Sequence, residues 1–156
     1  MTMTFYAGIQ SDLDGQPVYG PVIDFKHHAD EINLNATDWL EEPVYVPNPD
    51  YIPNASFDLS NDNARALMQT LNLPMDGESA ILPIGQVHAA CLRWTNARWR
   101  AEGPSAEVAP TTTRGALGAT MVDCGRHEGY MDRQIARLFA MVVEGQKRGA
   151  TDLVVG

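Results

Sequence analysis

Apolar residues recur at helical spacing in three stretches of the chain. The first stretch follows residues 60–63, whose Ser, Asn and Asp side chains can cap the exposed amides of a helix start, and it stops at Leu73-Pro74. The second has Pro83 in its first turn and runs to about Glu102. The third runs from Tyr130 to Arg148, with a glycine directly after it as terminator. The pattern therefore predicts three helices.

The second and third helices have wide apolar faces. Two neighbouring apolar stripes run along the second helix, which predicts that it packs deeply. One stripe consists of Ile84, Val87, Cys91 and Trp94, and the next of His88, Leu92, Thr95 and Trp99. The expected buried face of the third helix consists of Met131, Ile135, Leu138, Phe139 and Val142.

The first third of the chain has the pattern of β-strands and irregular segments. Residues 5–10 and 17–25 flank Asp14-Gly15, which is a strong hairpin-turn signal, and they predict an N-terminal β-hairpin. In the stretch that follows, four prolines limit the chain to short or edge strands, with residues 44–46 and 51–52 as candidates.

The remaining strand signals complete the fold prediction. Residues 57–59, 117–123 and 153–155 are short strand candidates, and residues 103–113 form a polar loop rich in helix and strand breakers. This order predicts an α+β domain of two layers, with three helices on one mixed sheet. Because a helix joins residues 117–123 to residues 153–155, we expect these two strands to form a right-handed parallel crossover.

The composition is that of one ordinary globular domain. A chain of 156 residues, 44% of them hydrophobic, can bury a core without metal or disulfide staples. We expect a single domain over residues 1–156, divided into a β-rich and irregular acidic part (1–58) and a helical and β part (59–156). No apolar run is long enough for a transmembrane helix, and the N-terminal residues do not have the pattern of an export signal, so we expect a cytoplasmic protein without membrane contact.

Charge is distributed unevenly along the chain. The first 80 residues have 13 acidic side chains against two basic ones, Lys26 and Arg65, whereas the remaining 76 have nine basic and seven acidic ones. Such an acidic half can steer the protein toward a basic partner, mimic nucleic-acid phosphate or simply keep the chain soluble. We expect the contact surface in the proline-rich segment, at Asp38, Trp39, Glu41, Glu42 and Asp50.

Two Cys/His pairs at a spacing of three residues suggest a metal site. Zinc takes four nitrogen or sulfur ligands in a tetrahedron, and His88 with Cys91 and Cys124 with His127 would supply two each. The first pair lies within an amphipathic helix, where cysteine is commonly a small buried hydrophobe, so we favour structural cysteines over zinc. We expect neither a disulfide framework nor a bound cofactor.

A second group of titratable residues surrounds His27-His28. Imidazoles close to the carboxylates of Asp24, Asp30 and Glu31 could form an acid/base pair or a catalytic metal site. Adjacent residues of a strand point to opposite faces, so at most one of the two histidines can join a one-sided site. We favour a solvated strand end.

Basic residues gather late in the second predicted helix and before the third. Arg93, Arg98 and Arg100 accompany Trp94 and Trp99, and guanidinium groups with indoles can bind phosphate and stack on bases. On a helix the two tryptophans point about 140° apart, so we expect one of them to face the core. The net charge of −9 also opposes general nucleic-acid binding.

The loop before the third helix is a further place for an anion. Residues 125–130, including Arg126, join a predicted strand to a helix start, where backbone amides can hold an anion. The spacing of its glycines matches neither the dinucleotide nor the P-loop fingerprint, and the sequence has no Gly-x-Ser-x-Gly motif. We therefore favour a protein that is not an enzyme.

Two segments together resemble a family. Residues 57–73 resemble the strand, Ser-Asn-x-Asn-Ala, helix, Leu-Gly-Leu segment of small uncharacterised proteins from bacteriophages, prophages and their bacterial hosts. The Gly-Arg and Gly-Tyr pairs within 125–130, with the helix, glycine and strand that follow, are similar to the C-terminal part of these proteins. Asn72 stands where the pattern has glycine, and residues 43–53 have no counterpart. The resemblance implies a phage or mobile-element setting and no activity.

This setting orders the functional hypotheses. The first is a non-enzymatic protein that binds a host protein, or a protein–nucleic-acid complex, through its acidic half and inhibits a defence system such as CRISPR. The second is a small-molecule or nucleotide binder that uses the four arginines at 93, 98, 100 and 126. The third is a metal-dependent hydrolase built on His27 and His28, and the fourth is a virion component. A homo-oligomer is compatible with each of them.

Overall fold

The computed structural model describes residues 2–13, 16–22, 31–32, 45–46, 56–101, 103–114, 120–123 and 125–156. Its helices are α1 (Asn61–Thr70), α2 (Ile84–Arg100) and α3 (Tyr130–Lys147). Its strands are β1 (Thr2–Leu13), β2 (Gln16–Pro21), β3 (Glu31–Ile32), β4 (Tyr45–Val46), β5 (Ser56–Ser60), β6 (Ala80–Pro83), β7 (Thr111–Arg114), β8 (Thr120–Asp123) and β9 (Asp152–Val155).

The main sheet is built around the long strand β1. Its C-terminal half pairs with β2, and its N-terminal half pairs with β5. On its other side β1 pairs with β9, and β9 pairs with β6. The pairing of Leu13 with Gln16 leaves two residues between β1 and β2, so the N-terminal hairpin predicted from Asp14-Gly15 is confirmed.

Alternation along these strands places one apolar face against the helices. Phe5 of β1 lies opposite Phe57 of β5 and Val155 of β9, and the rings of Phe5 and Phe57 stack with centroids 4.9 Å apart. Leu82 of β6 lies opposite Leu153 of β9. All five side chains are buried, because residues that pair across strands point to the same face of a sheet.

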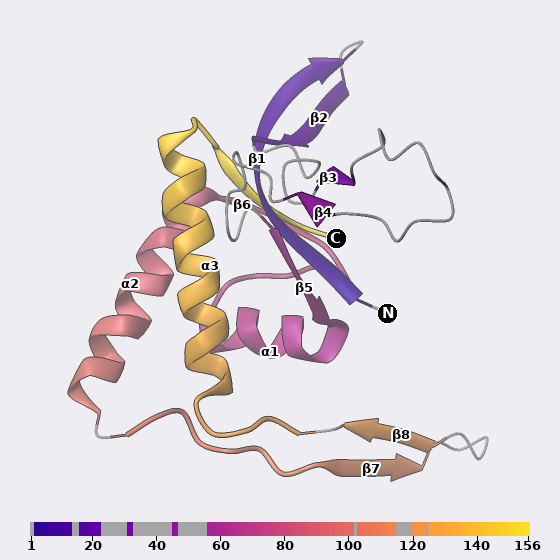
Figure 1. Ribbon diagram of the computed structural model, residues 1–156, viewed down its shortest axis with the longest axis vertical. Helices are drawn as coiled ribbons and strands as arrows, with labels where there is room; N and C mark the ends of the chain where they lie inside the picture. Colours follow the sequence, from indigo (N-terminus) through magenta and orange to yellow (C-terminus); the bar gives the residue numbers. More distant parts are fainter. Residues whose placement is uncertain are drawn as a thin grey trace.

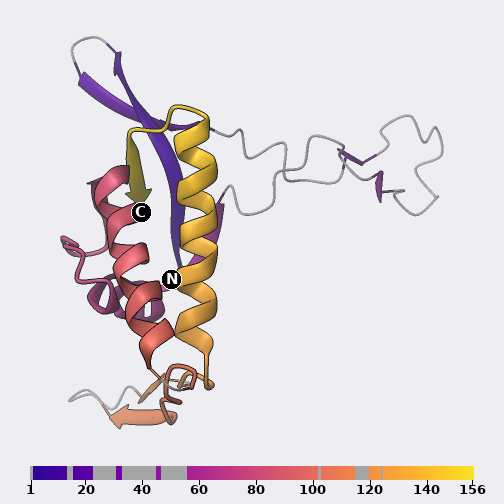
Figure 2. The ribbon, with the colours of Figure 1, turned by 90° about the vertical axis from the view of Figure 1, so that its left-hand side faces the viewer.

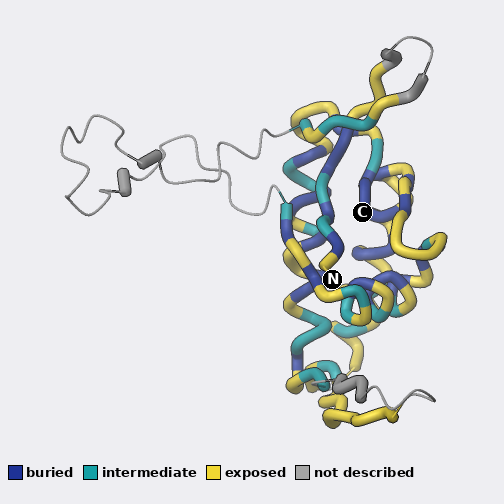
Figure 3. Tube along the Cα trace, turned by 90° about the vertical axis from the view of Figure 1, so that its right-hand side faces the viewer, coloured by how far each residue is buried: buried dark blue, intermediate teal, exposed yellow. Residues whose placement is uncertain are grey.

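The helices form the second layer. Figure 2 shows α2 and α3 side by side in front of the sheet, and Figure 3 shows that buried residues concentrate between the two layers. Leu138, Met141 and Val142 of α3 and Val87 and Cys91 of α2 are fully buried there. The predicted α+β class, with three helices and an N-terminal hairpin, is therefore confirmed for the described residues.

Helix α1 begins and ends where its side chains predict. The Ser60 hydroxyl accepts a hydrogen bond from the Asn63 amide at 3.4 Å. At the other end, the Leu73 amide donates to the Met68 carbonyl and the Asn72 amide to the Gln69 carbonyl. These two bonds form a Schellman motif, in which Asn72 takes the left-handed position (φ 54°) that glycine usually fills.

Helix α2 differs from its prediction in two ways. Ala80–Pro83 forms the edge strand β6, which the sequence analysis did not identify, and the helix begins only at Ile84. Of the two apolar stripes, the one with Ile84 and Cys91 packs on the core, whereas in the other Leu92 is 41% and Trp99 91% exposed. The predicted deep packing of both stripes is therefore wrong.

The predicted parallel crossover is also wrong. β8 pairs with β7 in a two-stranded antiparallel hairpin, and β9 pairs with β1 and β6, again antiparallel. The described part of the chain thus contains no parallel pair that would make the sheet mixed. Figure 1 shows the β7/β8 hairpin lying below the ends of α1 and α3, away from the main sheet. β7 covers the last three residues of the segment predicted as a polar loop, 103–113, and extends to Arg114.

The last helix and strand match their predictions. α3 spans Tyr130–Lys147, within one residue of the predicted end, and Gly149 follows with a φ of 85°. β9 contains the predicted residues 153–155 and lies between β1 and β6. Of the two strands predicted in the proline-rich segment, 44–46 corresponds to β4, which pairs with β3, and 51–52 lies outside the described residues.

Candidate functional site: the outer face of the helices

An open, largely apolar groove of about 710 Å³ lies between α2 and α3 on the side away from the sheet. Figure 2 shows this side of the two helices, and none of the described elements covers it. The groove follows α3 over nearly its whole length and the last turns of α2. Its walls include Trp94, Trp99, Ile135, Ala136, Phe139, Ala140 and Val143.

The two tryptophans of α2 occupy different environments. Trp94 is partly buried and packs against the core, which confirms that one of the two faces inward. Trp99, five residues later, is 91% exposed at the rim of the groove. A fully exposed indole beside an apolar groove is typical of a contact surface, because tryptophan offers a large apolar area that water covers poorly.

An ion pair closes one end of the groove. Arg98 Nε lies 3.2 Å from Asp132 Oδ1, and the side chains are 25% and 31% exposed. Arg98 also donates to the Gly103 carbonyl at 2.6 Å, and the Ser105 amide donates to Asp132 at 2.6 Å. Partial burial raises the pKa of Asp132, but the hydrogen bonds from Ser105 and the charge of Arg98 outweigh this and hold it below its usual value.

At the opposite end of the groove the charges also pair within the chain. Glu144 accepts hydrogen bonds from Lys147 at 3.4 Å and from Arg148 at 2.9 Å. The hydrogen bond from Arg148 is the main reason that the pKa of Glu144 lies below its usual value. Between these two groups, the described residues that line the centre of the groove carry no charge.

The four arginines predicted to bind an anion do not come together. Arg93 and Arg100 are exposed on α2, on the side away from the groove. Arg98 is engaged by Asp132, as described above. Arg126 lies on the other side of Trp94, in a separate cavity of about 260 Å³, where its Nε donates to Asn63 Oδ1 at 2.8 Å.

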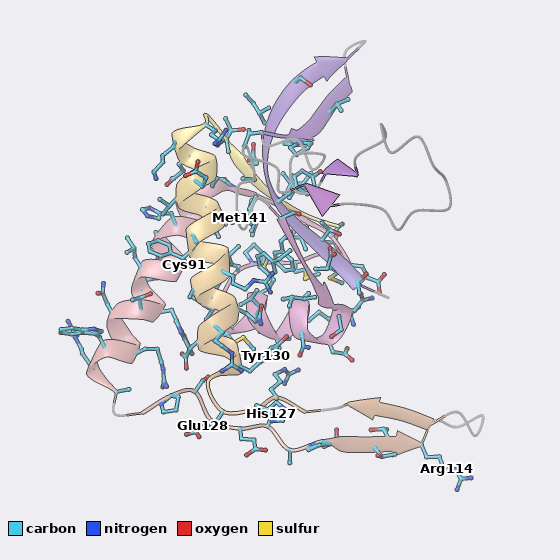
Figure 4. The ribbon with its side chains drawn as sticks, in the orientation of Figure 1. Cys91, Arg114, His127, Glu128, Tyr130 and Met141 are labelled. Atoms are coloured by element: carbon cyan, nitrogen blue, oxygen red, sulfur yellow. The ribbon has the colours of Figure 1, made fainter. Side chains whose placement is uncertain are left out.

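The residues proposed as zinc ligands have other surroundings. The His88 ring stacks on Phe139 with centroids 5.3 Å apart, and His127 is exposed in the loop before α3. Cys91 is completely buried, and burial raises the pKa of its thiol to about 12, so it remains protonated at neutral pH. Figure 4 shows Cys91 and His127 at different levels of the molecule. Cys124 lies outside the described residues.

Among the described residues, no group of three or more His, Cys, Asp or Glu side chains could hold a metal ion. The structure does not describe His27, His28, Asp24 or Asp30, nor the side chain of Glu31. The predicted contact residues Asp38, Trp39, Glu41, Glu42 and Asp50 also lie outside the described residues.

The outer face of α3 was not predicted. Of the five residues predicted on its buried face, Ile135, Leu138 and Val142 are buried, whereas Met131 and Phe139 are only partly so. The sequence did contain a signal for this face: Ile135, Ala136, Phe139, Ala140 and Val143 are all uncharged. Together with the buried stripe, these residues make much of the helix circumference apolar.

Comparisons with known proteins add no relative. No family model matches the chain, and no curated protein and no solved structure matches it. No helix of the described residues has the length and apolar content needed to cross a membrane.

Proposed function

We propose that the protein is a non-enzymatic binding protein of a phage or mobile element, which attaches to a host protein through its acidic N-terminal half. The observation that carries this proposal is the distribution of charge. The first 80 residues contain 13 acidic and two basic side chains, a net formal charge of −11, whereas the rest of the chain is close to neutral. A concentration of negative charge of this size attracts basic surfaces and accelerates their association.

The acidic side chains of this half that the structure describes are available to a partner. Asp58, Asp62, Asp76 and Glu78 are all exposed. Arg65 lies 3.7 Å from Asp62 and 3.3 Å from Glu78, so it compensates part of this charge. The four carboxylates with one arginine leave a net formal charge of −3 on this part of the surface.

Two of these carboxylates are held by hydrogen bonds from neighbouring elements. Asp58 of β5 accepts a hydrogen bond from Thr4 of β1 at 2.7 Å, and Glu78 accepts one from Asn61 at the start of α1 at 2.8 Å. A preorganised charged surface loses less entropy on binding than a flexible one. The acidic side chains can therefore contribute to recognition as well as to solubility.

The partner class follows from the charge and the setting. A basic site on a host protein, or the nucleic-acid channel of a protein–nucleic-acid complex, is complementary to an acidic surface of this kind. The resemblance of residues 57–73 and 125–155 to proteins of phages and prophages favours a host defence complex, such as a CRISPR effector, as the target. Binding would then inhibit the target by occupying a site for nucleic-acid phosphate.

The experiment is an affinity purification of the tagged protein from a bacterial lysate at low and at high salt, with mass spectrometry of the bound proteins. We expect a stoichiometric partner whose retention falls sharply with salt, because surface charges are screened at high ionic strength. The affinity for that partner is then measured for Glu41→Lys/Glu42→Lys, which we expect to bind at least tenfold more weakly.

The control carries the same change of charge in the other half of the chain. Glu107→Lys/Glu128→Lys replaces two exposed carboxylates outside the acidic half and should retain most of the affinity. Equal losses in both variants would show that only total charge matters and would contradict a localised acidic contact. A purified protein that retains only a nucleotide, with no protein partner, would favour the small-molecule hypothesis instead.

A further inference from the structure

Helix α3 has a second, largely apolar stripe beside its buried face. At the edge of this stripe, Phe139 still packs partly against the core and stacks on His88. At 100° per residue, Asp132, Ala136, Phe139, Ala140, Val143 and Lys147 fall within an arc of about 100° on the helix surface. Leu138, Met141 and Val142 occupy the other side and are fully buried. Ala136 and Ala140 are exposed and Phe139 and Val143 only partly buried. A surface helix normally has charged residues in this position, so the stripe has the composition of an interface.

The order of residues in this stripe is self-complementary. The centre of symmetry is the point midway between Phe139 and Ala140. Asp132 precedes this point by the same number of residues by which Lys147 follows it. Ala136 and Val143 are related in the same way. An identical helix running antiparallel, with the twofold axis at this midpoint, therefore places an acid opposite a base at each end. Between them, each small alanine faces a larger apolar side chain.

We propose that α3 is the dimerisation helix of this protein, and that the occupant of the groove is α3 of a second copy in antiparallel orientation. Asp132 and Lys147 keep their partners Arg98 and Glu144 within each chain. The charges at the ends therefore favour the antiparallel register only because a parallel arrangement would place Asp132 against Asp132 and Lys147 against Lys147. The alanines let the two helix backbones approach closely, and the exposed parts of the partner's Phe139 and Val143 lie over them while Phe139 stays stacked on His88. An isologous contact of this kind closes at two subunits.

The dimer also accounts for Trp99. This side chain lies next to Arg98, which is paired with Asp132, so it stands at the N-terminal end of the stripe. In the antiparallel arrangement the last turn of the partner's α3 arrives at that end. Trp99 then covers apolar surface of the partner helix instead of being 91% exposed. Large aromatic side chains buried at a protein interface often contribute a large share of the binding energy.

Surface charge of the groove favours a second copy over a charged partner. Arg98 with Asp132, and Glu144 with Lys147 and Arg148, are already paired within one chain. The stripe therefore offers no large net charge to a strongly acidic or basic ligand. None of the described residues among the first 80 lines the groove, so a dimer formed there would present their acidic side chains twice.

The first experiment measures the oligomeric state by sedimentation as a function of concentration. We expect a dimer for the native protein and at least a tenfold higher dissociation constant for Ala140→Glu, which puts two carboxylates beside the twofold axis. Ala140 is exposed, so this change should leave the fold intact. Ala89→Glu is the matched control, because Ala89 is exposed on α2 and does not line the groove.

A second experiment tests the register. Chains with Ala136→Cys are mixed with chains with Val143→Cys, both in a Cys124→Ser background, and oxidised. We expect a mixed disulfide between the two chains and little product from Ala136→Cys alone, since positions 136 of the two copies would lie about 10 Å apart along the helices. A monomer at all concentrations, a dimer unaffected by Ala140→Glu, or equal crosslinking in the Ala136→Cys homodimer would overturn the proposal.

Discussion

Arg98 and Asp132 join the end of α2 to the start of α3, with Nε and Oδ1 3.2 Å apart. The same two side chains also form hydrogen bonds to the backbone. Arg98 also donates to the Gly103 carbonyl, and Asp132 accepts from the Ser105 amide, so both side chains hold the loop that separates the helices. Charged hydrogen bonds to backbone groups contribute more than an exposed ion pair, because the backbone is already ordered.

Replacement of Asp132 should destabilise the protein in a pH-dependent way. We expect Asp132→Asn to lower the free energy of unfolding by about 1 to 2 kcal/mol at pH 7. The pKa of Asp132 is depressed in the folded state. The stabilisation is therefore complete above the unfolded-state pKa of about 4 and is lost as the pH falls through the folded-state value.

Urea denaturation of the native protein and Asp132→Asn at several pH values between neutrality and strong acid measures this difference. The two curves of stability against pH should converge at the acid end. A difference that stays constant over this range would mean that the carboxylate acts through its shape rather than its charge.

The C-terminus of α1 makes a second prediction. Asn72 has a φ of 54°, a conformation that alanine adopts only with strain. We expect Asn72→Ala to lower the free energy of unfolding by about 1 to 2 kcal/mol, and Asn72→Gly to change it by only a few tenths. Thermal or chemical denaturation of the two variants checks this. Equal effects of alanine and glycine would contradict the role assigned to the backbone conformation.

This position also shows what local sequence can predict. The capping residue Ser60, the end of α1, the end of α3 at Gly149 and the Asp14-Gly15 turn depend on one or two neighbouring residues, and the structure has the expected elements at each. Asn72 fills the left-handed position of the Schellman motif because asparagine tolerates this conformation better than other residues apart from glycine.

The pairing of strands that lie far apart in the sequence was less predictable. β8 pairs with β7 instead of β9, and nothing in the two short sequences distinguishes the alternatives. β6 was missed because its four residues run directly into α2 through Pro83. The arginines of α2 belong to different sides of the helix, a separation that their clustering in sequence hides. Ala136 and Ala140 line the groove. Alanine occurs both in cores and on surfaces, so the helical periodicity did not predict whether these two residues are buried or exposed.

Burial of the Cys91 side chain leads to a prediction about its chemistry. The thiol is fully buried and burial raises its pKa to about 12, so it carries almost no thiolate at pH 8. In a Cys124→Ala background, Cys91 should react with iodoacetamide many times more slowly in the folded protein than in urea. Mass spectrometry of the time course measures both rates. Rapid labelling of the folded protein would indicate an accessible thiolate and would make Cys91 a candidate metal ligand again.

Two helical glycines provide the sharpest test of how α3 packs on the sheet. Gly145 is buried in α3, and a Cβ atom added there would overlap the Ala7 side chain of β1 and approach Ala150 and Ile84 within 3.3 Å. Ala7 lies on the central strand of the sheet, so it cannot move aside without shifting the paired backbones. We expect Gly145→Ala to lower the free energy of unfolding by about 1 to 3 kcal/mol.

The same substitution at Gly85 should have the opposite sign. Gly85 lies in the first turn of α2, and an added Cβ would meet no atom within 4 Å. Alanine there reduces the entropy of the unfolded chain and should stabilise the protein by up to about 1 kcal/mol. Chemical denaturation of both variants gives the comparison directly. If Gly145→Ala were as stable as Gly85→Ala, α3 would not approach β1 as closely as the structure shows, and the outward orientation of its second apolar stripe would lose its structural basis.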